Sequence, residues 1–332
     1  MKSRRHFFMK RIGLIVMVCC SLLGRSQNIV PNPSFELNDS CPSWYSQFLL
    51  VQQWGIISNS CDYFNECASN PVASVPSNAF GWQYAASGQG YSGVYVYAGT
   101  GACGTIGYRE YIGCPLFNPL SIGTRYFISL KVSPTTSSTT PLKYATNRVG
   151  VNFLTTIQSP FNQFKTINHS VLYSNNVISD TANWTKVFGS FMADSQYAFL
   201  GIGNFFVDSL TDTINIGGTA DCAYFYIDDV CVSTDSVYAA NYVWTGTDEA
   251  PIEINAALFP NPNSGSFTLN YFLPHGSSGK MEIYNLLGEK VYEQELKKNS
   301  REVQVNLSLA KGIYLCRVVS GNETRSVKFV VE

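Results

Sequence analysis

Short segments in which apolar and polar residues alternate run through most of this 332-residue chain. Alternation places every second side chain on one face of a strand, whereas a helix requires a period of 3.6 residues. Residues 27–256 keep no helical period for longer than a turn or two. Their clearest predicted strands are residues 91–97, 107–112, 125–132, 148–154, 184–192, 198–205 and 224–232. A strand-only segment of this size predicts a two-sheet sandwich or jelly roll.

Residues 257–332 contain a second series of shorter strand patterns. These predicted strands are residues 267–272, 281–284, 289–296, 303–307, 313–319 and 326–331. Gly and Asn residues separate them, as is usual at tight turns. The pattern predicts a small immunoglobulin-like β-sandwich. We therefore expect an all-β chain with two domains.

Three sequence blocks give the second domain a more specific resemblance. The first is Leu-Phe-Pro-Asn-Pro-Asn-Ser-Gly-Ser-Phe-Thr-Leu from Leu258, the second is Met-Glu-Ile-Tyr-Asn-Leu-Leu-Gly from Met281, and the third is Leu-Ala-Lys-Gly-Ile-Tyr-Leu from Leu309. In this order and spacing they resemble the type A C-terminal sorting domain of the type IX secretion system of Bacteroidota, over residues 257–332. The resemblance implies two partners: an outer-membrane translocon that reads the domain, and a sortase-type protease that cuts in a linker, residues 235–256.

The N-terminus also predicts export. Five basic residues precede the apolar run Ile12–Leu23: Lys2, Arg4, Arg5, Lys10 and Arg11. Small residues follow, so residues 1–26 are predicted to be a secretory signal peptide that is cut after Ser26. A transmembrane anchor is the alternative, but the apolar run is shorter than the ~20 residues that a spanning helix needs. We expect a mature chain without a transmembrane span, either secreted or attached to the outer-membrane surface.

Charge separates the two predicted domains. Residues 27–256 hold sixteen acidic and seven basic residues, a net charge of −9, whereas residues 257–332 hold seven acidic and nine basic residues, a net charge of +2. Nucleic-acid binding requires basic side chains to neutralise phosphates. A body this acidic is therefore not expected to bind nucleic acid.

The first and last strand patterns of the body carry a second resemblance. Asn28–Glu36 and Tyr224–Val232, which contains Ile-Asp-Asp-Val, resemble the terminal strands of galactose-binding-like jelly rolls, the fold of many carbohydrate-binding modules. The resemblance spans the body, residues 27–234. In that family a first-strand Glu and a last-strand Asp commonly hold a structural calcium ion, which implies Glu36 with Asp228, or alternatively Asp229. The other interpretation is that Glu36 caps a turn and Asp228 pairs with a cation such as Arg109.

Cysteines are expected to form disulfides, because export places them in an oxidising compartment. Zinc is the alternative, but the body has no Cys-x-x-Cys pair and a single histidine, His169. In a jelly roll, the strand at residues 107–112 and the last strand are expected to be antiparallel neighbours. Antiparallel pairing would join Cys103 to Cys231 and Cys114 to Cys222, and Cys61 with Cys67 would close a short loop. In the C-terminal domain, Cys316 is predicted to be a buried thiol.

Aromatic residues in the first part of the body are the candidate ligand contacts. Sugar rings present an apolar C–H face that packs against an aromatic ring, while amides bind the hydroxyls. The rings of this region are Trp44, Trp54, Trp82, Tyr84, Tyr91, Tyr95 and Tyr97. From these we select Trp82, Tyr84, Tyr91 and Tyr95, with the nearby amides Asn78 and Gln83. The alternative is that the rings belong to the sandwich core, since aromatic side chains dominate core burial.

The sequence contains none of the common catalytic motifs of hydrolases or nucleotide-binding enzymes. We therefore predict an exported binding or adhesion protein, with glycan as the expected ligand and no enzymatic activity. Two alternatives stay open. The body could be a structural surface protein without a sugar ligand. It could also be a polysaccharide hydrolase, because two catalytic carboxylates need no sequence motif.

Overall fold

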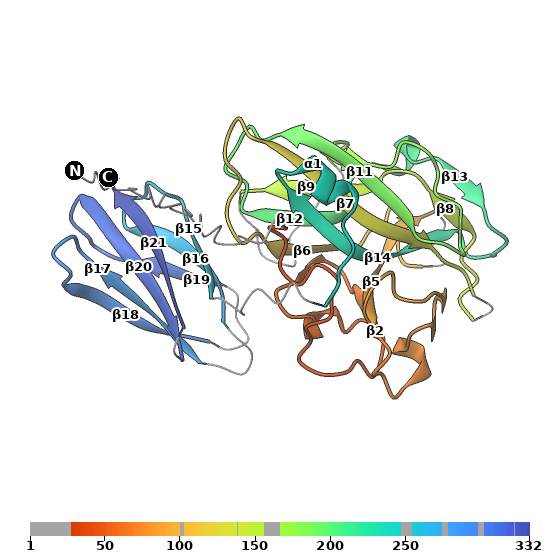
Figure 1. Ribbon diagram of the computed structural model, residues 1–332, viewed down its shortest axis with the longest axis horizontal. Coiled ribbons are helices and arrows are strands. Elements are labelled where there is room, and N and C mark those ends of the chain that lie inside the picture. Colours follow the sequence, from red (N-terminus) through yellow and green to blue (C-terminus); the bar gives the residue numbers. More distant parts are fainter. Residues whose placement is uncertain are drawn as a thin grey trace, which may run out of the picture.

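The computed structural model describes residues 28–99, 103–137, 139–155, 167–246, 254–273, 278–297, 302–321 and 323–332 (Figure 1). The predicted signal peptide, residues 1–26, lies outside the described residues. Strands dominate the described residues, as predicted for an all-β chain. No helix among them is long and apolar enough to cross a membrane.

The body contains two five-stranded sheets. The first has the order β1 (Gly55–Ser58), β6 (Tyr111–Pro115), β12 (Phe199–Asn204), β9 (Val149–Leu154) and β10 (Leu172–Tyr173). The second has the order β11 (Thr185–Met192), β7 (Arg125–Pro134), β14 (Cys222–Ser233), β5 (Gly90–Ala98) and β2 (Asp62–Asn65). The long strands alternate between the two sheets along the chain, and both sheets contribute side chains to one apolar core. The body is thus a β-sandwich; its membership of the galactose-binding-like jelly rolls stays a prediction.

Short elements complete the body. A hairpin joins β3 (Ser77–Asn78) to β4 (Gly81–Trp82), and a two-stranded sheet pairs β8 (Tyr144–Thr146) with β13 (Thr213–Asn215), which is distant in sequence. Single helical turns occur at η1 (Phe48–Leu50), η2 (Pro71–Ala73) and η3 (Asp208–Leu210), and α1 (Ser236–Ala240) follows the last body strand. The Asp235 side chain caps α1 by accepting hydrogen bonds from the backbone of Val237 and Tyr238. The segment predicted as a linker, residues 235–256, therefore begins with a helix that packs on β7 and β14.

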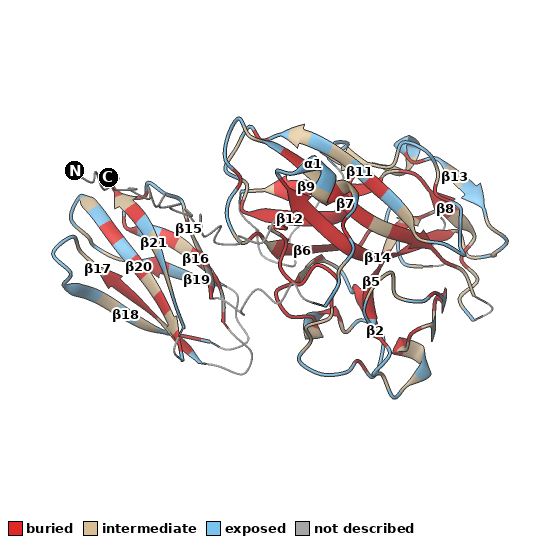
Figure 2. Cartoon of the chain, viewed as in Figure 1, coloured by how far each residue is buried: buried red, intermediate tan, exposed pale blue. Residues whose placement is uncertain are grey.

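Strand β14 is buried along its whole length (Figure 2). One of its faces meets the sandwich core through residues such as Phe225 and Ile227. The other face meets a second aromatic cluster that contains Phe64, Phe80 and Tyr226. The segment between β2 and β5, together with α1 near Cys231, thus covers the outer face of β14, and no face of this strand is left for solvent.

The C-terminal domain is a smaller sandwich with its own core. Its first sheet has three strands in the order β15 (Asn255–Phe259), β16 (Ser266–Phe272) and β19 (Glu302–Asn306). Its second sheet has four strands in the order β18 (Lys290–Leu296), β17 (Gly279–Tyr284), β20 (Gly312–Ser320) and β21 (Glu323–Val331). Residues 255–256, predicted to be linker, already pair with β16. Cys316 is buried in this core without a disulfide partner, and burial raises the pKa of its thiol to about 12.

The predicted strand at residues 107–112 begins later than expected, and this shift explains why the disulfide predictions are wrong. Residues 103–110 form a loop in which Gly104 and Gly107 have φ angles of 118° and 78°. Strand β6 then pairs with β1 and β12 in the first sheet, whereas the neighbours of β14 are β5 and β7. Cys114 therefore lies in a different sheet from Cys222.

The observed disulfides are Cys103–Cys222 and Cys41–Cys67. Cys222 lies opposite Ala98 at the end of β5, so the loop that follows β5 brings Cys103 beside it. These two bonds exclude the predicted pairs Cys103–Cys231, Cys114–Cys222 and Cys61–Cys67. For Cys61 the reason is local, because strand β2 begins directly after it and extends the chain away from Cys67.

We predict that replacing both Cys103 and Cys222 with Ala lowers the free energy of unfolding of the body by about 2–4 kcal/mol, because the bond closes a long loop in the unfolded chain. Chemical denaturation of the wild-type and variant proteins measures this difference. Peptide mapping without reduction provides the control for connectivity: a Cys103–Cys231 peptide would contradict the fold described above.

Candidate functional site

Two of the predicted ligand residues are exposed: Trp82 at the end of β4 and Tyr84 two residues after it. Trp82 is 55% exposed and Tyr84 is 57% exposed, and their ring centroids are 4.9 Å apart at an interplanar angle of 73°. Trp82 is the last residue of β4 and pairs with the exposed Ser77. An edge-to-face pair leaves a ring face available to a ligand.

The residue between these rings fixes their position. The Gln83 side chain is buried and donates hydrogen bonds to Ser133 Oγ at 3.0 Å and to the Ala182 carbonyl at 3.4 Å. Its backbone carbonyl accepts a hydrogen bond from the Tyr91 hydroxyl at 3.0 Å. The Trp184 indole donates to the Tyr84 carbonyl at 2.9 Å. These contacts hold the segment while its outward side chains stay free of the core.

A second exposed pair, Trp44 and Tyr45, lies in the loop that precedes η1. Trp44 is 47% exposed and Tyr45 is 42% exposed, and their ring centroids are 5.1 Å apart. The ring centroids of Tyr45 and Phe80 are 6.5 Å apart in an edge-to-face arrangement, and this contact connects the loop to the β3–β4 hairpin. Sequence reasoning did not single out Tyr45. The available signal was the Trp-Tyr pair itself, between Cys41 and the next apolar segment and without strand alternation.

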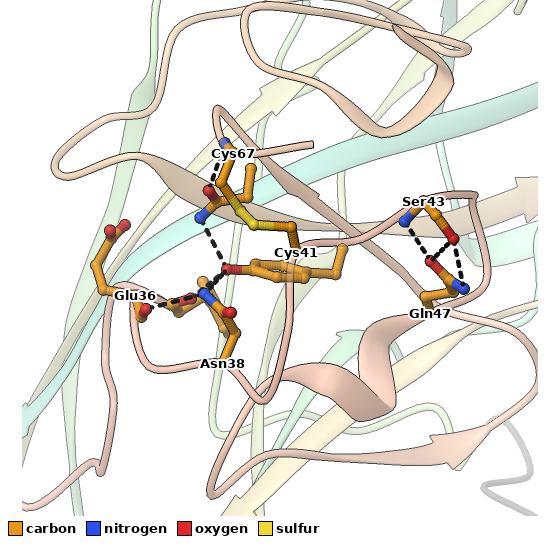
Figure 3. The surroundings of a disulfide bond; sticks show 9 residues. Glu36, Asn38, Cys41, Ser43, Gln47 and Cys67 are labelled. Atoms are coloured by element: carbon orange, nitrogen blue, oxygen red, sulfur yellow. Dashed lines mark hydrogen bonds between the residues drawn. A yellow bond between two sulfur atoms is a disulfide. The ribbon is translucent and has the colours of Figure 1, made fainter. Parts of the chain in front are cut away.

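The loop that carries Trp44 and Tyr45 is held at three points. The Cys41–Cys67 disulfide closes one side of it (Figure 3). The Gln47 side-chain oxygen accepts hydrogen bonds from the backbone of Ser43 at 2.7 Å and of Trp44 at 2.9 Å. The Ser46 backbone N–H donates to the Asp62 carboxylate. The two aromatic pairs are therefore displayed by fixed backbone, although their side chains contribute little to the core.

Three of the remaining predicted ligand residues are buried, so predicting them as ligand contacts was wrong, whereas the role of the half-buried Tyr95 stays a prediction. Tyr91, Asn78 and Gln83 are buried. Asn78 donates to the Tyr91 hydroxyl at 3.0 Å and accepts from the Tyr226 hydroxyl at 2.7 Å. Tyr95 is half-buried between the rings of Phe80 and Tyr224. These residues instead form the layer that supports the exposed pairs.

The predicted calcium ligands do lie around one short segment, residues 86–90. Asp228 and Asp229 occupy a bulge in β14, where Asp229 has a φ of 49°. Asp228 accepts four hydrogen bonds: from Ser34 Oγ at 2.8 Å and from the backbone of Ala86 at 2.8 Å, Ser87 at 3.3 Å and Asp229 at 2.7 Å. Glu36 accepts from the backbone of Gln89 and Gly90, both at 2.9 Å.

Protein donors bind both oxygens of Asp228 and one oxygen of Glu36. Asp229 forms an ion pair with Lys131 at 2.8 Å, and Arg109 pairs with Asp208 rather than with Asp228. Burial and the charge of Asp229 raise the pKa of Asp228, and burial raises the pKa of Glu36. In the described part of the chain, no group of three or more His, Cys, Asp or Glu side chains is arranged to hold a metal. Calcium binding would require these donors to be exchanged for the ion, and it stays a prediction.

A second pair of buried carboxylates lies beneath the Trp44–Tyr45 loop. Asp62 is 2% exposed and Glu110 is 1% exposed. Asp62 accepts hydrogen bonds from the Tyr224 hydroxyl and the Ser46 backbone. Glu110 accepts from the Tyr95 backbone at 2.9 Å and the Tyr108 hydroxyl at 2.9 Å. Among the described residues, no basic side chain forms a salt bridge with either carboxylate.

Burial, followed by the charge of Glu110, raises the pKa of Asp62, and burial raises the pKa of Glu110. The folded state thus retains protons that the unfolded state releases above about pH 4. The stability that the two protonated carboxyl groups contribute is fully present at a pH below the pKa values that Asp62 and Glu110 have in the unfolded chain. This stability is lost as the pH rises through the higher pKa values that the two groups have in the folded protein.

We therefore predict that the free energy of unfolding of the body decreases as pH rises above about 4, and that Asp62→Asn makes this dependence shallower. Thermal unfolding measured across a pH series tests both statements. The exposed Asp194→Asn variant is the control and should keep the wild-type dependence, because Asp194 is not among the charges that raise the pKa values of the buried carboxyl groups. A wild-type curve that rises over the same range would contradict the assignment of raised pKa values.

Comparison with protein families identifies one part of the chain. Residues 257–332 match the model described as "Secretion system C-terminal sorting domain". This match supports a secreted or surface-attached protein that the type IX secretion machinery recognises. We refer to residues 257–332 as the sorting domain below. A search of curated protein sequences finds no match.

Comparison with solved structures gives only weak similarities. The adhesin domain of Epf from Streptococcus pyogenes is 11% identical, covering 73% of this chain and 76% of that chain with a TM-score of 0.26. A β-glucuronidase from Faecalibacterium prausnitzii is 8% identical, covering 73% of this chain and 45% of that chain with a TM-score of 0.21. The chicken CNTN1 FN1–FN3 domains are 9% identical, covering 67% of this chain and 60% of that chain with a TM-score of 0.21. These scores are too low to support an argument about function.

Proposed function

We propose that the protein is exported through the type IX secretion system and that its body binds glycans at the cell surface. The observation that carries the binding proposal is the display of Trp44, Tyr45, Trp82 and Tyr84. Folding favours burial of large aromatic side chains, so four exposed rings on fixed backbone need a separate explanation. A ligand that packs against them provides one.

Rigid presentation favours binding, because few degrees of freedom are lost when the ligand arrives. Tyr and Trp offer large contact areas with only two side-chain torsions each. Polar groups accompany the rings: Ser77 is exposed opposite Trp82, and Ser43 is exposed next to Trp44. Hydroxyl and amide groups of this kind can bind sugar hydroxyls.

The charge of the body narrows the ligand class. The net charge of −9 of residues 27–256 disfavours polyanions such as sulfated or uronic-acid polymers, since like charges repel. We therefore propose neutral polysaccharides as the ligands.

The proposal predicts that Trp82→Ala and Trp44→Ala each weaken binding to a neutral glycan by about tenfold, the size of effect seen when a central aromatic contact is removed. A glycan array with the mature protein identifies the ligand, and titration of the variants measures the loss. Phe188→Ala is the matched control, because Phe188 is an exposed ring on β11 outside the two aromatic pairs. A blank array from a correctly folded body would favour a structural surface protein instead.

Hydrolysis is a separate outcome of the same experiment. A glycosidase requires two accessible carboxylates, whereas Asp62 and Glu110, whose charges act on one another, are both buried. Incubation of the protein with the polysaccharide panel should release no reducing ends. Product formation that Glu110→Gln abolishes would replace the binding proposal with an enzymatic one.

Export makes an independent prediction about the mature protein. A sortase-type protease that removes the sorting domain should leave body peptides, without peptides from residues 270–332, in the surface fraction. Mass spectrometry of that fraction and of whole cells tests this outcome. An intact C-terminus on the surface protein would contradict processing.

A further inference from the structure

The most exposed apolar side chains among the described residues lie in the sorting domain. Leu287 is 84% exposed and Leu286 is 75% exposed, at the tip of the turn between β17 and β18. Next to this turn, Tyr284 pairs with Leu315 across the sheet, and Ile313 and Leu315 are exposed on β20. We call these five residues the apolar end of the β18-β17-β20-β21 sheet.

The turn is held in one conformation. Asn285 Oδ1 accepts hydrogen bonds from the backbone of Leu287 and Glu289, both at 3.0 Å. Gly288 donates to the Asn285 carbonyl at 3.0 Å with a φ of 81°, which suits glycine. The turn therefore holds both leucine side chains exposed to solvent, where they do not stabilise the fold through burial.

Charged residues surround the apolar end unevenly. Further along the same face, Glu282 pairs with Lys280 at 2.8 Å and with Lys290 at 3.4 Å. At the apolar end itself, Lys328 lies opposite Leu315 and the exposed Lys311 directly precedes β20, and neither forms a salt bridge among the described residues. Lys290, opposite Tyr284, is instead paired with Glu282 and Glu293. The outer face of the other sheet is different, since it presents polar side chains such as Thr268 and Gln304. An apolar patch with a basic rim occurs on one outer face of the sandwich.

We propose that this apolar end is the surface by which the secretion machinery binds the sorting domain, and that its partner is an apolar recess with an acidic rim on a translocon component. The inference rests on the proposed export function. Two of the three sequence blocks that carry the resemblance, from Met281 and from Leu309, build this surface. Lysines at the rim complement an acidic partner in charge.

The test is an export assay with the full chain in a bacterium that has the type IX system. We expect Leu286→Ser together with Leu287→Ser to lower the amount of surface protein about tenfold or more, as for loss of an interface hot spot. Thermal unfolding of the purified variant should match the wild type, because both side chains are exposed. Lys328→Glu leaves the apolar residues in place and should lower export by reversing the charge of the rim.

Two variants and one deletion control the interpretation. Ile122→Ser removes an exposed apolar residue from the body, and Gln304→Ala changes the opposite outer face of the sorting domain. Both should be exported like the wild type. Deletion of residues 254–332 should prevent export; if it does not, the export proposal itself fails. If the deletion variant is retained in the cell while both the leucine variant and Lys328→Glu are exported normally, the sorting function stands and the proposed surface is overturned.

Discussion

The burial of β14 on both faces is the constraint on which the body depends. One face completes the sandwich core, and the other packs against Phe64 of β2 and against Val75 and Phe80 from the segment between β2 and β5. Phe80, the centre of that covering layer, stacks on Tyr224 at 4.1 Å with nearly parallel planes. Because β14 needs this layer, the β3–β4 hairpin and the loop before η1 are fixed in place. The positions of the exposed aromatic pairs follow from that fixation.

Neighbouring residues thus have different roles: some hold the backbone in place, and others expose their side chains to solvent. Along residues 82–84 the inward side chain of Gln83 fixes the segment, and the outward rings of Trp82 and Tyr84 are left to solvent. The Trp44–Tyr45 loop uses a disulfide and a buried carboxylate for the same purpose. In the sorting domain, Asn285 holds the turn that exposes Leu286 and Leu287. In each case hydrogen bonds, or hydrogen bonds with a disulfide, hold the backbone in place beneath side chains that are not themselves buried.

Much of this fold could be predicted from the sequence, because alternation of apolar and polar residues determines strands locally. Six of the seven predicted body strands agree with the structure to within a few residues. Trp82 and Tyr84 are exposed, and their role as ligand contacts stays a prediction. The disulfides could not be predicted, since they depend on which sheet β6 joins. Tyr91 was wrongly predicted as a ligand contact because alternation cannot show that a third layer covers the outer face of a sheet.

Hydrogen exchange of the exported protein, with and without a pool of neutral polysaccharides, is the most direct test of the binding function proposed for the body. Exchange reports the bound surface without any substitution, and the active polysaccharide in the pool need not be identified first. The account predicts slower exchange within residues 41–47 and 77–84 when polysaccharide is present. Unchanged exchange in both segments, or protection confined to other parts of the body, would contradict it.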